Sequence, residues 1–201
     1  MGSNFQPLTW KIRMKIALDA AKGLAFLHSD EVEKKHGDFK TSKILIDYNY
    51  NAKLSFFGLV QCRSDSNMPD FDMVDMGTQI NAEPEYIDTD HLTKESDVYN
   101  FGVVLLEIMS GKRAFDRNRP LREHDLVEWA KPLLTRKHKI SQVMDVRIEG
   151  QYSSREAKKL AHIVIQCLSE RPEHRPKTEE IVRSLEQLQD SNDTIGGVVS
   201  S

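Results

Sequence analysis

The segment from Val98 to Met109 constrains the fold of this chain more than any other part, because it is apolar nearly all round a helix. A helix with one apolar face lies at a surface, whereas a helix that is apolar on every side has to be enclosed by the rest of the chain. Gly111 follows at a position where a left-handed residue commonly ends a helix. The sequence therefore predicts a central, buried helix over residues 94–110.

Other stretches predict further helices and one small β element. Apolar residues recur at helical spacing, and Ser153 with Glu156 forms a capping-box pattern. The additional predicted helices cover residues 12–29, 126–133, 153–169 and 178–188. Two short apolar pieces, residues 44–46 and 52–54, flank a turn-like sequence and predict two strands.

The remaining stretches of the sequence indicate loops, one short helix and the two terminal segments. Residues 61–78 are polar and irregular, Pro84 opens a short helix, and residues 116–123 form a charged loop. The fold class is therefore mainly α with a small β element. We expect an N-terminal segment over residues 1–9, a folded region over 10–189 and a disordered tail over 190–201.

The composition excludes several function classes. Of the 201 residues, 39% are hydrophobic and 29% are charged, with a net charge of −3. This balance excludes a disordered polyelectrolyte and a nucleic-acid binder that relies on bulk positive charge. The longest apolar run, Phe101 to Leu106, is too short for a transmembrane segment, and the first residues show no secretion signal. A myristoylation motif is incomplete because residue six is Gln6.

Cysteine and histidine spacing predicts neither a disulfide framework nor a zinc site. Cys62 and Cys167 are the two cysteines of the chain, and Cys167 falls in an apolar helical series, which predicts a reduced core residue. The seven histidines include no HxxxH pair.

Five motifs together resemble the C-terminal lobe of a eukaryotic protein kinase. They are His36-Gly37-Asp38-Phe39-Lys40-Thr41-Ser42-Lys43 at the catalytic loop, Phe56-Phe57-Gly58 at the D-F-G turn, Glu83-Pro84-Glu85 at A-P-E, Ser96-Asp97-Val98-Tyr99 opening the central helix, and His174-Arg175-Pro176. Their order matches that of the family, so the resemblance implies a protein-kinase-like C-terminal lobe.

Three further stretches are similar to plant receptor-like cytoplasmic kinases of subfamily VII. They are Ala21–His28, Asp38–Ser42 and Glu123–Ala130. The resemblance extends over about residues 2–190 and implies serine/threonine kinases of plant signalling, many of them in immunity at the plasma membrane. It also implies ATP and Mg²⁺ as cofactors of the intact relatives.

The nucleotide site that this family requires is degraded in the sequence. The chain has no Gly-rich phosphate loop, so we expect the N-lobe to be absent. Lys43 replaces the metal-binding Asn of the catalytic loop, and Phe56 replaces the metal-binding Asp of D-F-G. Asp38 at the catalytic-base position and Lys40 remain, and we interpret both as vestigial. We therefore expect no cofactor.

Regulation by phosphorylation is also degraded. Gly37 replaces the Arg that binds an activation-segment phosphate in many kinases. The activation segment includes Phe56, Gly58 and Thr78, and it has no Ser or Thr from Asn67 to Gly77.

Scaffold positions of the family are retained. The resemblance implies that Asp97 accepts backbone hydrogen bonds from the catalytic loop and that Glu85 and Arg175 form a buried ion pair. Trp129 lies in a helix that many kinases use for partner contacts, although packing within the lobe is the alternative interpretation.

Three functional hypotheses follow. The leading one is a catalytically inactive pseudokinase that binds a protein partner, such as an intact kinase or receptor. The alternatives are a weak serine/threonine kinase that uses Asp38 with a nucleotide site supplied by a partner, and a truncated product without function. The expected location is cytoplasmic, or peripheral at the plasma membrane through a partner, without nucleic acid or a transmembrane segment.

Overall fold

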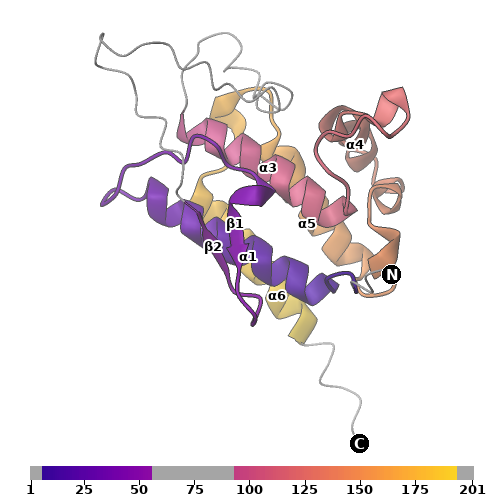
Figure 1. Cartoon of the computed structure of the whole chain (residues 1–201), viewed down its shortest axis with the longest axis horizontal. Coiled ribbons are helices and arrows are strands. Elements are labelled where there is room, and N and C mark those ends of the chain that lie inside the picture. The colour runs from indigo at the N-terminus through magenta and orange to yellow at the C-terminus, as the bar shows by residue number, and fades with distance from the viewer. Residues whose placement is uncertain (1–5, 56–92, 194–201) are drawn as a thin grey trace, which may run out of the picture.

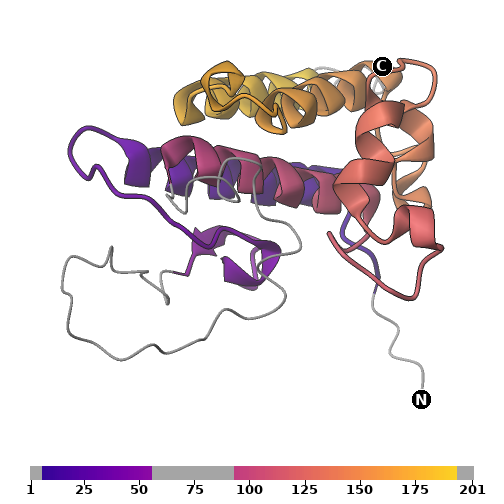
Figure 2. The same cartoon turned by 90° about the horizontal axis from the view of Figure 1, so that it is seen from above.

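The computed structural model describes residues 6–55 and 93–193, which form two helical layers with a β-hairpin on one side (Figures 1 and 2). The long helices are α1 (Trp10–His28), α3 (Lys94–Ser110), α5 (Ser154–Cys167) and α6 (Thr178–Asp193), and α4 (Leu126–Leu134) is shorter. Strands β1 (Ile44–Ile46) and β2 (Ala52–Leu54) pair antiparallel with Leu45 opposite Lys53. Single 3-10 turns are η1 (Thr41–Lys43), η3 (Leu121–Glu123), η4 (Ile140–Gln142), η5 (Val146–Ile148) and η6 (Pro172–His174).

The central helix α3 is buried as its sequence predicts. Phe101, Leu105 and Leu106 have no measurable exposure, and α5 covers the helix face at Gly102. Thr93 caps the start of α3 in a reciprocal pair with Ser96, and Gly111 ends the helix at φ 65°. A side chain at Gly111 would clash with Asp145, so the position requires glycine for space as well as for backbone conformation.

Helix α1 lies beside α3 in one layer, and α5 and α6 form the second layer (Figure 2). Trp10 at the start of α1 is 1% exposed, and its indole Nε1 donates a hydrogen bond to Glu156 of α5 at 3.1 Å. The hairpin packs on the opposite side of α1, with Leu54 close to Gly23. Because α1 contacts α3, α6 and the hairpin, it holds the two layers and the hairpin together.

Helix α4 and its flanking turns form one end of the molecule (Figure 2). Asp125 caps α4 by accepting hydrogen bonds from the backbone N–H groups of Val127 and Glu128. Leu126 and Ala130 are fully buried toward the core. Trp129 is partly buried against the same core, as the packing interpretation expects, and the Lys112 ammonium lies 4.0 Å from its ring centre.

The mainly α fold class with a small β element is confirmed, and both strands match their predicted bounds. The capping box at Ser153 and Glu156 is also confirmed. Cys167 is a free, buried cysteine, as predicted. The predicted loop 61–78, the short helix at Pro84 and Cys62 lie outside the described residues.

Several boundaries differ from the sequence prediction. Helix α6 runs on to Asp193, so residues 190–193 are helical and do not begin the tail, because neither Gly nor Pro interrupts the chain before Gly196. Helix α1 begins at Trp10, two residues early, because Thr9 caps it. The charged loop 116–123 ends in the turn η3. No helix within residues 6–55 and 93–193 is both long and apolar enough to cross a membrane.

Candidate functional site

Asp97 anchors the loop 36–43 to the first turn of α3 through hydrogen bonds. Its carboxylate is 1% exposed and accepts backbone hydrogen bonds from His36 at 2.6 Å and from Gly37 at 2.8 Å. The ring Nε2 of His28, at the end of α1, lies 3.0 Å from the same carboxylate. One buried side chain therefore joins the loop to both helices of the first layer.

Aromatic side chains also pack the loop 36–43 against the core. Phe39 is 4% exposed, and its ring lies edge-on to Phe101 of α3 and to His36, with ring centres 5.6 and 5.2 Å away. Burial lowers the pKa of His36 despite the nearby charge of Asp97. The backbone on both sides of Asp38 is thus anchored to the core.

Asp38 lies between two lysine side chains at the surface of this loop. Its carboxylate is 3.1 Å from the Lys40 ammonium and 3.6 Å from the Lys43 ammonium. The side chain of Asp38 is 25% exposed and that of Lys43 is 22% exposed. The structure therefore brings together Asp38, Lys40 and Lys43, the three candidate residues of the catalytic loop.

The residues present do not fit a magnesium–nucleotide complex. Mg²⁺ binds oxygen ligands, whereas Lys43 brings a cationic ammonium to within 3.6 Å of the Asp38 carboxylate. The benzyl side chain of Phe56 has no oxygen to offer at the second ligand position. In the described part of the chain, no group of three His, Cys, Asp or Glu side chains has the geometry of a metal site.

Arg175 is anchored under the start of α3. It is 7% exposed, donates to the carbonyl oxygens of Ser169 at 2.9 Å and Glu95 at 3.0 Å, and stacks over the Tyr99 ring at 4.9 Å. The predicted partner Glu85 lies outside the described residues, as do Phe56, Gly58 and Thr78. The expected ion pair therefore stays a prediction.

Sequence reasoning missed a buried ionic cluster centred on Asp145. Its carboxylate accepts hydrogen bonds from Arg13 at 2.6 Å and from Arg147 at 2.8 Å. Burial opposes ionisation of Asp145, but the hydrogen bonds from Arg147 and Arg13 outweigh it and lower the pKa to about 2. The only sequence signal is a pair of charged residues, Asp145 and Arg147, in the otherwise apolar stretch Val143 to Ile148.

The sequence also did not predict a pocket of about 420 Å³. It opens beside β1, and Ile16, Ile44 and Ile108 are among its apolar lining residues. Glu107 supplies a carboxyl group to the wall, and burial raises its pKa, although the Ala114 N–H donates a hydrogen bond to it at 2.7 Å.

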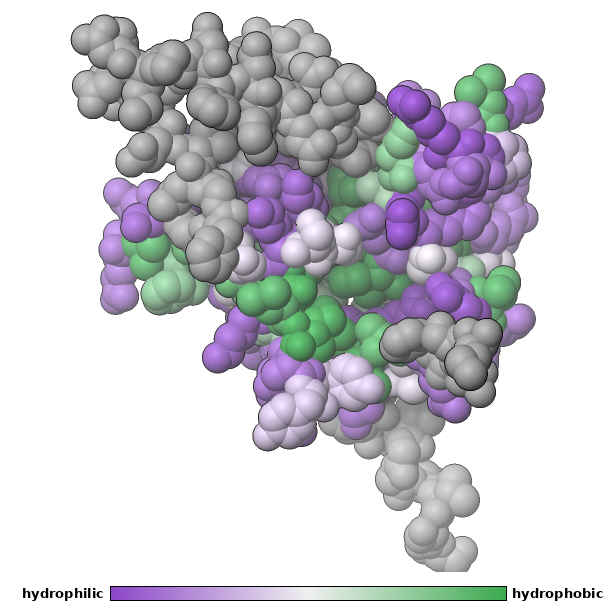
Figure 3. Space-filling view, in the orientation of Figure 1, coloured by the Kyte–Doolittle hydropathy of each residue, from purple (hydrophilic) through white to green (hydrophobic). Residues whose placement is uncertain are grey.

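Exposed apolar side chains lie beside this pocket, on β1 and the turn that follows it. Figure 3 shows hydrophobic side chains gathered over the hairpin. Leu45 and Ile46 of β1 are 58% and 45% exposed, and Tyr48 in the turn is 91% exposed. We call β1 and its turn, residues 44–50, the apolar face; a surface of this kind marks a contact site more often than an isolated exposed leucine does.

Comparison with known proteins identifies the family. A family model of protein tyrosine and serine/threonine kinases matches residues 1–185. The chain is 54% identical over 192 residues to receptor-like cytoplasmic kinase 176 of Oryza sativa subsp. japonica, covering 96% of this chain and 49% of that protein. It is 52% identical over 193 residues to the serine/threonine-protein kinase BIK1 of Arabidopsis thaliana, covering 94% and 48% respectively.

A third relative, the probable serine/threonine-protein kinase PBL9 of Arabidopsis thaliana, is 53% identical over 196 residues, covering 98% of this chain and 48% of that protein. The chain spans about half the length of these relatives. With the family model matching most of its residues and the motif order at the loop 36–43 and α3 agreeing, the chain belongs to the protein tyrosine and serine/threonine kinase family.

Proposed function

We propose that the chain is a catalytically inactive protein-kinase-like module, a pseudokinase, that acts in plant kinase signalling by binding a protein partner. The observation that carries the proposal is the Lys43 ammonium, 3.6 Å from the carboxylate of Asp38. Asparagine is the metal ligand expected at this position of the family. A positive charge there repels the divalent cation on which phosphoryl transfer depends.

The second lost ligand strengthens the argument. Phe56 replaces the Asp that would bind the principal Mg²⁺ ion. Removing a single preorganised electrostatic group from an active site typically lowers the rate by about 10²–10³-fold. Losing both metal ligands therefore leaves Asp38 without the charge stabilisation that the transfer requires, even though its backbone is well anchored.

The apolar face supports a role in protein binding. Ile46, which is 45% exposed, lines the pocket, and Leu45 and Tyr48 of the same segment are also exposed. Burial of such side chains against a partner contributes about 25 cal/mol per Å² of apolar surface removed from water. The partner we propose is an intact kinase or receptor, and we place the protein in the cytoplasm, with immune signalling as the pathway.

A phosphotransfer assay tests inactivity. The chain is incubated with labelled ATP, Mg²⁺ or Mn²⁺ and a general protein substrate, beside an active relative as the positive control. We expect no incorporation above background. Incorporation that Asp38→Asn abolishes would overturn the proposal, because it would show that Asp38 still acts as a base.

A weak kinase remains the second candidate, because the Asp38 carboxylate keeps its contact with Lys40 at 3.1 Å. In that case a partner would supply the nucleotide site. Thermal unfolding with millimolar ATP and Mg²⁺, measured with and without a candidate partner kinase, separates the two. A nucleotide-dependent rise in melting temperature that requires the partner favours the weak kinase, and no rise favours the pseudokinase.

A fragment without function is distinguished by its solution behaviour. The apolar face of a non-functional fragment would drive aggregation. We expect instead a monomeric protein with a single cooperative unfolding transition, measured by light scattering and circular dichroism.

A mutation of the apolar face tests partner binding. Leu45→Asp is expected to weaken the binding of a partner kinase without changing the unfolding transition.

A further inference from the structure

Positive charge is concentrated at one end of the molecule, in residues 112–139, which we call the basic end. This segment contains nine Lys and Arg residues and four Asp and Glu residues, whereas the whole chain carries a net charge of −3. It comprises the loop after α3, the turn η3, helix α4 and the residues that follow, and both views place it at the same end (Figures 1 and 2). The rest of the chain is acidic, so this end has an electrostatic character of its own.

The loop at residues 114–125 is closed and held by its own hydrogen bonds. Leu126 N–H donates to the Ala114 carbonyl at 2.8 Å, and Asp116 N–H donates to the His124 carbonyl at 3.0 Å. The Arg119 guanidinium donates across the loop to the carbonyls of Arg113 at 2.7 Å and His124. Arg119 therefore holds the two sides of the loop together, and these hydrogen bonds define the shape of the loop.

This closed loop presents two arginines and a leucine to solvent. Arg117 and Arg122 are exposed, and Leu121 between them in the chain is 82% exposed. No ion pair with an acidic side chain is found for Arg117 or Arg122 within the described residues. The acidic residues of the loop have other partners, since Glu123 pairs with Lys112 at 3.1 Å and Asp116 lies 4.0 Å from Arg119.

The far end of α4 adds further positive charge. Arg136 and Lys137 are exposed directly after the helix, and the described residues place no carboxylate in an ion pair with either. Because the nine residues of α4 span only about 14 Å, the two groups of basic side chains belong to one continuous end of the molecule.

We propose that the basic end is a docking surface for an anionic lipid membrane. Exposed arginines match the phosphate groups of lipid headgroups, and each basic side chain near an anionic leaflet adds to the electrostatic attraction. The exposed Leu121 is placed to enter the boundary between headgroups and acyl chains. A projecting, preformed loop that offers an apolar tip flanked by arginines favours a broad lipid surface over an acidic peptide, which a groove would bind better.

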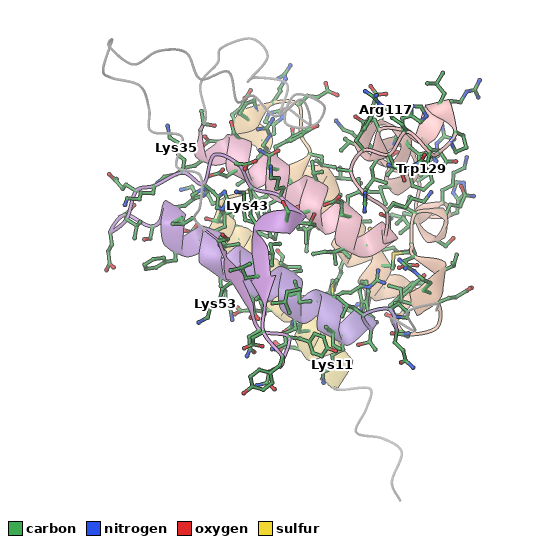
Figure 4. All side chains as sticks on the ribbon, viewed as in Figure 1. Lys11, Lys35, Lys43, Lys53, Arg117 and Trp129 are labelled. Carbon is green, nitrogen blue, oxygen red and sulfur yellow. The ribbon has the colours of Figure 1, made fainter. Side chains whose placement is uncertain are left out.

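The proposal uses no side chain of the loop 36–43 or of the apolar face, so it does not depend on catalytic inactivity. Figure 4 shows Arg117 on the opposite side of the molecule from Lys35. Lys34 and Lys35 are also exposed, and their reversal provides a control with the same change of net charge.

Vesicle co-sedimentation of the full chain tests the proposal. We expect binding to phosphatidylcholine vesicles that contain about one-third phosphatidylserine and none to pure phosphatidylcholine, with release as NaCl rises from about 0.1 to 0.5 M. The double variant Arg117→Glu/Arg122→Glu is expected to weaken binding about tenfold or more, whereas Lys34→Glu/Lys35→Glu leaves it within about twofold. Leu121→Ser is expected to weaken binding at both salt concentrations.

Three results would overturn the proposal. They are no difference between the two kinds of vesicle, an equal loss in the two charge-reversal variants, and binding to a poly-glutamate peptide without binding to vesicles. The last result would instead assign the surface to an acidic protein segment. Because all substituted side chains are exposed, circular dichroism and thermal unfolding are expected to be unchanged, which separates lost binding from lost folding.

Discussion

The Arg13 guanidinium and the Asp145 carboxylate are 2.6 Å apart although 132 positions separate them in the chain. Both side chains are less than a tenth exposed. Arg13 also donates to the carbonyls of Leu8 and Ile108, each at 2.9 Å. The guanidinium of Arg13 thereby connects the start of α1 to the end of α3 and to the turn η5. Arg13 also lines the pocket beside the apolar face.

Removal of the Asp145 carboxylate should destabilise the fold strongly. Asp145→Asn leaves the buried Arg13 charge without its carboxylate partner, which costs about 3–5 kcal/mol. Arg13→Met should cost less, because Arg147 still pairs with Asp145 at 2.8 Å. The surface pair Lys22 and Glu186, 2.9 Å apart and about half exposed, provides the control, and Lys22→Ala should cost less than about 1 kcal/mol. Equilibrium urea unfolding measures both, and equal losses would contradict the prediction.

The same pair makes stability depend on pH in a defined direction. The pKa of Asp145 falls from its ordinary value of 3.8 to about 2 in the folded protein. A lowered pKa means that its contribution, about 2 kcal/mol, is complete above about pH 4 and is lost as the pH falls through 2. We expect the difference in unfolding free energy between wild type and Asp145→Asn to shrink between pH 5 and pH 2, and a constant difference would contradict this.

Local patterns in the sequence predicted the elements of this fold well. The apolar run in α3, the capping box at Ser153 and the paired apolar pieces of β1 and β2 each act within a few residues, so their signals are readable without the rest of the chain. The apolar period alone predicts a start of α1 at Ile12, two residues late, because the helix begins after Thr9, whose side chain accepts a hydrogen bond from Ile12 N–H.

Contacts between distant residues could not be predicted in the same way. The turns η4 and η5 have no regular hydrophobic period, and Asp145, which caps η5, is held by Arg13 from a distant part of the chain. The anchoring of the loop 36–43 depends on Asp97, and only the family resemblance pointed to that residue. The environment of Asp38 likewise required the structure, because the distances to its two lysines follow from how the loop folds back.

A comparison of two glycines tests the packing of α3 against α5. A methyl group at Gly102 would lie 2.7 Å from Cβ of Cys167, whereas one at Gly23 would lie 3.0 Å from Cγ of the Leu54 side chain. Gly102→Ala should therefore destabilise the protein by about 1–3 kcal/mol, despite the better helix propensity of alanine.

Gly23→Ala should change stability by less than about 1 kcal/mol, because the half-buried Leu54 side chain can move aside and alanine favours the helix. Chemical denaturation of the two variants measures the difference. Equal stability of the Gly102→Ala and Gly23→Ala variants would contradict the close packing of α3 against α5 at Gly102.

The thiol of Cys167 should be unreactive until the protein unfolds. Burial raises its pKa to about 12, against the opposing charge of Arg175, so the reactive thiolate is nearly absent at pH 8. In a Cys62→Ser variant, which removes the other thiol of the chain, a disulfide reagent should modify Cys167 no faster than the protein unfolds. Adding Ser141→Cys to that variant introduces an exposed thiol that should react at once. Rapid modification of Cys167 under native conditions would mean that the contact between α3 and α5 opens without global unfolding.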